Sequence, residues 1–148
     1  MKMMAFSCRQ DEREFFEQFG KQYGVEVETT REAPSMENAG LLKGCGAACV
    51  LTTPVAADLI DRWHEYGVKL ISTRTVGFEH VDYRHAAKLG IVVSNATYTP
   101  DTVAEYTIMT ILMAIRKMKI ILQRYIGQDF SLRHVRGREL GPMTVGVV

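Results

Sequence analysis

The chain has 148 residues and a formal net charge of +1, with 47% hydrophobic and 24% charged residues. This length and composition are typical of one globular domain, or of one domain and part of another. The apolar content is too high for an intrinsically disordered chain, and the longest uncharged segment of helical character, 106–115, is too short to cross a bilayer. We expect a cytoplasmic protein with neither a membrane nor a nucleic-acid partner, because a net charge near zero attracts neither.

Short apolar segments alternate with amphipathic ones along the first 98 residues. This alternation predicts an α/β fold with a parallel sheet whose two faces are covered by helices. The expected strands are 2–8, 25–29, 48–52, 69–73 and 91–95. Five β–α repeats predict a flavodoxin-like doubly wound sheet with strand order 2-1-3-4-5.

The intervening helices are predicted from their ends. Asp11 and Glu14 have the spacing of a capping box, and the aromatic residues that follow lie on one helical face. Thr53 and Pro54 predict a cap and a first-turn proline before a helix over 56–66. Asp82 opens a short helix that closes at Gly90, and 35–42 carries a weaker helical pattern.

The pattern changes after residue 98. Thr99-Pro100-Asp101 predicts a helix start, and the segment from 101 to about 125 reads as a single long helix. Its apolar residues cover more than one face, so we expect burial on two sides, by a domain and by a second subunit. The last six residues, 143–148, predict a buried strand, which needs neighbours on both edges and cover on both faces.

Three loops are candidate ligand sites, because ligands of open α/β sheets bind beyond the carboxyl ends of the strands. Gly77 lies in the loop after the fourth strand, where it is either part of an anion-binding backbone nest or a plain turn glycine. Tyr98 precedes a helix N-terminus, which favours anions, although a loop tyrosine can also serve packing alone. Arg9 follows the first strand and either meets a carboxylate or is solvated.

Other kinds of site have little support in the sequence. The four histidines have no metal-ligand spacing, and we expect no metal. The three cysteines form no C-x-x-C pair and are interpreted as small buried hydrophobic residues. The basic stretch 116–138 can bind phosphate or RNA, but it is more typical of a helix C-terminus and a solvated loop.

Two long segments carry a resemblance to a known family. Residues 72–82, STRTVGFEHVD, and 90–106, GIVVSNATYTPDTVAEY, closely resemble the NAD-dependent D-2-hydroxyacid dehydrogenases. Among these they are most similar to D-lactate dehydrogenases, the vancomycin-resistance type included. Residues 135–148 resemble the family's entry into its dinucleotide-binding fold. The resemblance implies a flavodoxin-like substrate domain over 1–98, without its C-terminal closing segment. It also implies that 99–148 is the start of a Rossmann NAD-binding domain.

The resemblance also implies roles for particular residues. Val76 and Gly77 would offer backbone N–H groups to the substrate carboxylate, and the Tyr98 hydroxyl would reach the 2-oxo acid. Val103 would lie near the nicotinamide, and the 101–125 helix would form a homodimer interface. Many lactate-specific members have a tyrosine after the third strand, where this chain has Leu51-Thr52-Thr53, so the preferred 2-oxo acid stays open.

The implied reaction is reduction of a 2-oxo acid by NADH, with pyruvate converted to D-lactate as the first expectation. The family's glycine-rich phosphate loop and its catalytic Arg, Glu and His have no counterpart in these 148 residues. We therefore expect no catalytic residue and no dehydrogenase activity in this chain alone. Two alternatives remain open: a non-catalytic flavodoxin-like module that dimerises or binds a ligand, and a truncated fragment.

Overall fold

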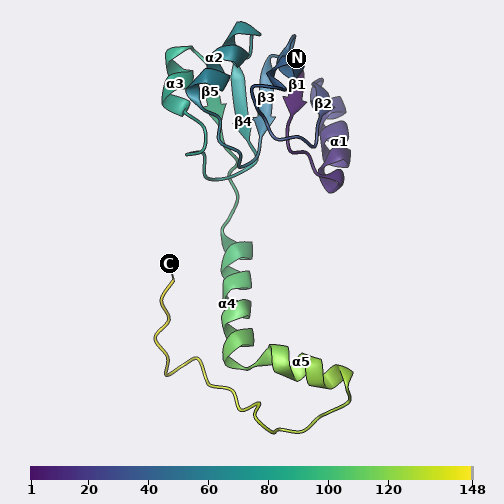
Figure 1. Cartoon of the computed structure of the whole chain (residues 1–148), viewed down its shortest axis with the longest axis vertical. Coiled ribbons are helices and arrows are strands. Elements are labelled where there is room, and N and C mark those ends of the chain that lie inside the picture. The colour runs from purple at the N-terminus through teal and green to yellow at the C-terminus, as the bar shows by residue number, and fades with distance from the viewer. Residues whose placement is uncertain (148) are drawn as a thin grey trace. The chain divides into compact units, whose positions relative to one another are not determined.

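The structure, a computed structural model, describes residues 1–147 (Figure 1). The chain divides into two compact units, Met1–Tyr98 and a second that begins at Thr99. Among the described residues, no helix combines the length and the apolar character that crossing a membrane requires.

The first unit is built on a five-stranded sheet. Its strands are β1 (Lys2–Ala5), β2 (Glu26–Thr29), β3 (Ala47–Val50), β4 (Leu70–Thr73) and β5 (Val92–Ser94). All neighbours pair in parallel in the order β2-β1-β3-β4-β5, which confirms the predicted topology. The first strand is shorter than predicted, because Ser7 adopts a left-handed φ of 51° that turns the chain out of the extended conformation.

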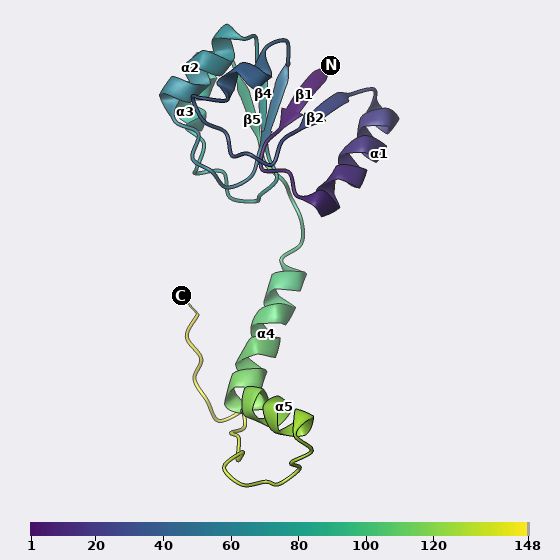
Figure 2. The same ribbon diagram turned by 45° about the vertical axis from the view of Figure 1, so that its right-hand side comes forward.

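Helices cover the two faces of the sheet. The helix α1 (Arg13–Tyr23) lies on one face, and α2 (Ala57–Glu65) and α3 (Tyr83–Lys88) lie on the other (Figure 2). This distribution follows from the strand order, because right-handed crossovers leave β1 in one direction along the sheet and β3 in the other. Two single turns complete the unit, η1 (Gln10–Glu12) and η2 (Ala39–Leu42).

The core lies between the sheet and α2. Trp63 of α2 is fully buried and stacks on Phe6, with ring centroids 5.9 Å apart. Ile60 of α2, Val50 of β3 and Ile71 of β4 are also fully buried in this cluster. Burial of these side chains is the main source of stability for the unit.

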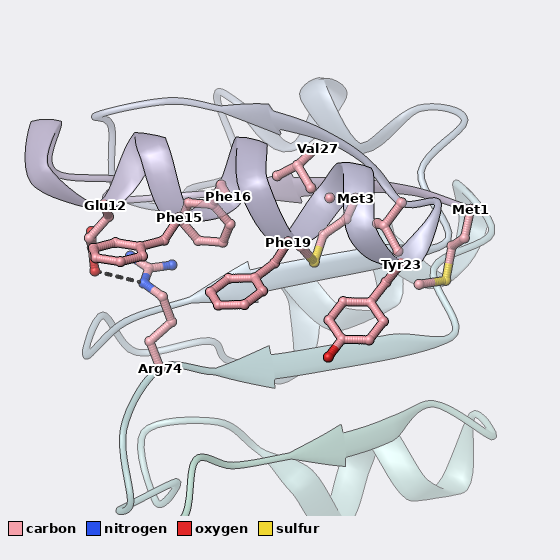
Figure 3. Close-up of a pocket in the computed structure, with 11 residues that line it drawn as sticks. Met1, Met3, Glu12, Phe15, Phe16, Phe19, Tyr23, Val27 and Arg74 are labelled. Atoms are coloured by element: carbon pink, nitrogen blue, oxygen red, sulfur yellow. Dashed lines mark hydrogen bonds and ion pairs between the residues drawn. The ribbon is translucent and has the colours of Figure 1, made fainter.

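The other face of the sheet holds an open groove of about 450 Å³ beside α1 (Figure 3). Its walls are mostly apolar, and Glu12 and Arg74 line it as charged residues. The aromatic residues predicted to share one face of α1 do line this groove: Phe15, Phe16, Phe19 and Tyr23.

Two predicted helix starts are wrong. The capping interaction before α1 comes from Glu12, whose Oε2 accepts the backbone N–H of Arg9 at 2.8 Å, and not from the Asp11–Glu14 pair. Before α2, the backbone of Val55 forms an isolated parallel bridge with Val81. That bridge holds the chain extended, so Thr53 and Pro54 stay outside the helix and α2 begins at Ala57 with no side-chain cap.

The short helix α3 matches its prediction, and the weak 35–42 pattern does so only in part. Asp82 caps α3 by accepting the backbone N–H of His85 at 2.9 Å, and Gly90 follows the helix with φ at 73°. Of the 35–42 segment, only Ala39–Leu42 is helical, as the single turn η2.

The single long helix predicted for 101–125 is wrong. The structure has two helices, α4 (Asp101–Ile115) and α5 (Met118–Ile126), separated by Lys117 in the left-handed conformation at φ 56°. The Ile115 carbonyl accepts the backbone N–H of Arg138 at 3.0 Å, and Gly137 packs against the same turn. A continuous helix would use that carbonyl for the N–H four residues on, so the returning segment ends α4.

Two further expectations for this unit are not met, and a third stays a prediction. The helix α4 begins at Asp101, with Pro100 in the capping position and no side-chain cap from Thr99. No residue of α4 is buried within the described residues, and its expected burial by a domain and a second subunit stays a prediction. Residues 143–147 form no strand, and Val148 lies outside the described residues. A strand needs a neighbour to hydrogen-bond with, and none is found within 99–147.

Candidate functional site

The candidate site lies where the strands of the first unit end. Because all five strands are parallel, the segments after β1, β3, β4 and β5 meet at one edge of the sheet. The loop after β4 begins at Arg74 and contains Val76 and Gly77, and the loop after β5 begins at Asn95.

These two loops are joined by hydrogen bonds to successive backbone carbonyls. The Thr75 carbonyl accepts the backbone N–H of Ala96 at 3.0 Å and the Thr73 hydroxyl at 3.1 Å. The Val76 carbonyl accepts the Asn95 side-chain amide at 2.7 Å. The chain thus fixes two adjacent peptide planes by their oxygen atoms.

The fixed planes decide the direction of two N–H groups. In a trans peptide the N–H points opposite to the carbonyl of the same plane. Asn95 therefore orients the Gly77 N–H, and Ala96 with Thr73 orients the Val76 N–H. Within residues 1–147, neither of these N–H groups has a hydrogen-bond acceptor, and Val76 is 44% exposed.

Two adjacent backbone N–H groups on exposed residues, without an acceptor within the described residues, are donors of the kind that a carboxylate accepts from. We call this feature the Val76–Gly77 amide pair. The next plane is fixed as well, because the Gly77 carbonyl accepts the Thr75 hydroxyl at 2.7 Å.

The structure places no special demand on glycine at position 77. Positive φ is found at Gly24, Gly44, Gly67 and Gly90, but not at Gly77, so left-handed freedom is not what this loop requires. A Cβ atom at Gly77 would lie 3.0 Å from Oε2 of Glu79. That oxygen is the end of a flexible side chain that can move aside, so the contact does not require glycine at this position either.

The other predicted site residues, Tyr98 and Val103, make no hydrogen bond to the amide pair among those of the described residues. Tyr98 is the last residue of the first unit, is 62% exposed, and its hydroxyl has no hydrogen bond within the described residues. Tyr98 comes two residues after Ala96, whose backbone N–H is bonded to the Thr75 carbonyl. Val103 lies in the first turn of α4, in the second unit, and is 58% exposed.

Sequence reasoning missed three residues that shape this edge: Thr73, Arg74 and Asn95. Thr73 is the buried polar residue at the end of β4. Arg74 forms an ion pair with Glu12, with Nε 3.3 Å from Oε1. A polar residue directly after a buried strand was the available signal for Arg74 and Asn95, but only the folded sheet shows what they contact.

Two cysteines, Cys8 and Cys49, lie near this edge of the sheet. Cys8 and Cys49 are free and buried, and burial raises the pKa of both thiols above the ordinary value. A raised pKa keeps them protonated at neutral pH, which suits packing and not nucleophilic chemistry. Across residues 1–147, no group of three His, Cys, Asp or Glu side chains is placed to hold a metal ion.

Comparison with known proteins adds a family context. The family profile described as D-isomer specific 2-hydroxyacid dehydrogenase, catalytic domain, matches residues 3–130. A D-specific alpha-keto acid dehydrogenase of Enterococcus faecalis is 37% identical, over 100% of this chain and 46% of that protein. A D-2-hydroxyacid dehydrogenase (NAD+) of Lacticaseibacillus paracasei is 33% identical, over 100% of this chain and 45% of that protein.

A solved structure gives the same result at the level of the fold. The apo-structure of D-lactate dehydrogenase from Escherichia coli superposes with a TM-score of 0.81 at 28% identity, over 93% of this chain and 45% of that one. The chain therefore spans less than half the length of the relatives it matches.

Proposed function

Because the chain belongs to the D-isomer specific 2-hydroxyacid dehydrogenases, we propose that it provides the substrate-carboxylate site of an oxidoreductase that reduces a 2-oxo acid with NADH. Pyruvate, giving D-lactate, is the substrate we propose first. The observation that carries the proposal is the Val76–Gly77 amide pair, oriented at the sheet edge and without an internal acceptor.

The chemistry of this pair suits a 2-oxo acid. Each N–H donates to one carboxylate oxygen, and hydrogen bonds to a charged acceptor are about twice as strong as neutral ones. With the carboxylate held, the neighbouring 2-oxo group has a fixed position, and the Tyr98 hydroxyl is the proposed second contact. These residues bind and orient the substrate, and bound NADH would supply the hydride.

The nucleotide site is only partly represented in this chain. The 148 residues contain no G-x-G-x-x-G sequence, and Val103 is the one proposed contact with the nicotinamide. We therefore assign carboxylate recognition to this chain, and no step of hydride or proton transfer to its residues.

We also propose that the chain forms a homodimer through residues 101–125. The proposal is supported by large apolar side chains that α4 leaves exposed, a feature typical of association surfaces. The most relevant are Val103, Tyr106, Ile108, Met109, Leu112 and Met113.

Pyruvate titration of the ¹⁵N-labelled chain tests the carboxylate site. We expect the amide resonances of Val76 and Gly77 to shift with a single saturable affinity, while inorganic phosphate at equal ionic strength leaves them in place. If pyruvate shifts neither amide resonance, the proposal is contradicted and a non-catalytic module is favoured.

An NADH oxidation assay with pyruvate separates binding from turnover. The chain alone is expected to show no turnover, because it lacks the phosphate-binding sequence and the family's catalytic Arg, Glu and His. A rate near the usual enzyme median of about 10 s⁻¹ would show that residues within the 148 carry out catalysis.

A further inference from the structure

Arg74 is placed differently from an ordinary loop arginine. It is the first residue after β4 and stands two residues before Val76, yet its side chain is only 15% exposed. Its backbone N–H donates to the Val50 carbonyl at 3.0 Å, which extends the β3–β4 pairing by one residue. The side chain lies on the α1 side of the sheet, where it contacts Glu12 and Phe16, and it is largely shielded from solvent.

Four of the five N–H donors of the Arg74 guanidinium contact acceptors within the protein. Nη2 donates to the carbonyls of Phe6 and Ser7, at 2.9 and 3.0 Å. Nη1 contacts Sγ of Cys49 at 3.3 Å, and Nε donates to Oε1 of Glu12 at 3.3 Å. An arginine has five N–H donors in a fixed planar fork, so at most one remains for any ligand.

The partners of Arg74 come from three elements of the first unit and from the segment after β1. The carbonyls follow β1, Cys49 belongs to β3 and Glu12 to η1. The guanidinium also lies 5.6 Å from the ring centre of Phe16 in α1, within the range of a cation–π contact. Figure 3 shows the Arg74 side chain reaching Glu12 beside the rings of Phe15 and Phe16.

Glu12 is itself held in place. Its Oε2 accepts the backbone N–H of Arg9 at 2.8 Å, and its side chain is 16% exposed. An ion pair this well covered keeps its geometry better than a surface pair, because both partners make further hydrogen bonds.

From this arrangement we propose that Arg74 is a positioning residue for the Val76–Gly77 amide pair, and that it does not touch the substrate carboxylate. The inference rests on the proposed function, since it explains how the carboxylate site is kept ordered without ligand. Arg74 fixes the start of the loop at the ends of β1 and β3, and Asn95 with Ala96 fixes its middle from β5. A site ordered during folding loses less entropy on binding.

The test is Arg74→Lys in the full 148-residue chain, read by ¹⁵N relaxation and by pyruvate titration. Lysine keeps the charge but has a single nitrogen, which cannot serve four acceptors in different directions. We expect the order parameters of Val76 and Gly77 to fall from about 0.85 to below about 0.6. The dissociation constant for pyruvate is expected to rise at least about tenfold, while core resonances such as that of the Trp63 indole stay unchanged.

The matched control is Arg62→Lys, since Arg62 pairs with Glu65 at 3.0 Å on an exposed helix surface and should change neither reading. Glu12→Gln is the second variant, and it decides the matter if Arg74→Lys does not fold. It keeps the side-chain shape, weakens the ion pair, and should loosen the amide pair to a smaller extent.

The outcomes separate this proposal from the proposed function. If the wild-type chain does not bind pyruvate but the order parameters fall in the variants, the substrate assignment is wrong and the role of Arg74 stands. If the wild type binds pyruvate and the folded variants keep an ordered amide pair with affinity within about twofold, the role of Arg74 is overturned.

Discussion

The two units of this chain differ in whether they bury their apolar side chains within the unit. In the first unit, Trp63, Phe6 and Ile60 are fully buried within the unit itself. In the second, neither α4 nor α5 has a buried residue, although both are rich in aliphatic and aromatic residues. The single apolar stripe of α2 is covered by the sheet of its own unit, whereas a helix that is apolar on several sides needs cover from more than one neighbour. The first unit therefore builds its own core, and the proposed homodimer is the cover that we expect for α4.

The largest expected effect is the difference in unfolding free energy between removing a large aromatic side chain from the first unit and removing one from the second. Trp63→Ala should lower the free energy of unfolding of the first unit by about 3–5 kcal/mol, because it leaves a cavity beside Phe6. Tyr106→Ala on α4 should change it by less than about 0.5 kcal/mol, since Tyr106 is 63% exposed. Urea unfolding of both variants gives the comparison, and equal losses would show that the second unit contributes to the same core.

Charge placed on α4 tests whether a second copy covers it. Leu112→Glu should raise the dimer dissociation constant at least about tenfold, which corresponds to about 1.4 kcal/mol, because a carboxylate would be buried in an apolar contact. Sedimentation velocity over a concentration series measures the change. Gln22→Glu on α1 introduces the same change of charge outside the proposed interface and serves as control. An unchanged association in Leu112→Glu would place any self-association elsewhere.

A smaller effect is expected from the side chain that orients the Gly77 N–H. Asn95→Ala removes the hydrogen bond to the Val76 carbonyl and should weaken pyruvate binding severalfold, through a loss of about 1 kcal/mol. Asn38→Ala is the matched control, because it removes a similar amide-to-carbonyl bond, to Ala33 at 2.8 Å, far along the chain from the amide pair. Calorimetric titration of both variants should show weakening in Asn95→Ala alone. The same weakening in both would mean that general stability, and not orientation, controls binding.

The smallest effect concerns pH. Burial raises the pKa of Cys8, Cys45 and Cys49 in the folded chain above the ordinary thiol value of 9.0. The unfolded chain therefore loses these protons first, so stability is fully present below pH 9 and falls as the pH rises through the folded pKa values. Unfolding measured between pH 8 and about 10.5 should show this decline. The Cys8→Ala, Cys45→Ala, Cys49→Ala triple variant should show a flatter profile, and an equal slope would assign the decline to other groups.

The sheet could be predicted from the sequence because its determinants are local. Strands of parallel α/β sheets are short runs of β-branched and aliphatic residues, and β3, β4 and β5 have that composition, although β5 is the edge strand and its Val92 is exposed. The α3 helix was also predictable, since the Asp82 cap and Gly90 act within a few residues of the helix they bound. The loop that holds Val76 and Gly77 was predicted as a candidate site from its place after a strand and from the family resemblance.

Two of the errors occurred where a contact between residues distant in the sequence decides the outcome. The break at Lys117 depends on Arg138, which lies more than twenty residues along the chain and takes the Ile115 carbonyl. The start of α2 depends on the bridge between Val55 and Val81. Neither contact can be predicted from the sequence around the helix it affects, because its second partner lies more than twenty residues away.

The sequence by itself determined the parallel α/β sheet, its strand order, the family and the loop that carries the amide pair. These properties depend on hydrophobic pattern and on short motifs, which act through neighbouring residues. Only the tertiary structure decided where α4 ends, which hydrogen bonds orient the Val76 and Gly77 N–H groups, and what Arg74 does. Each of those depends on hydrogen bonds between segments that are distant in the sequence and meet only in the folded chain.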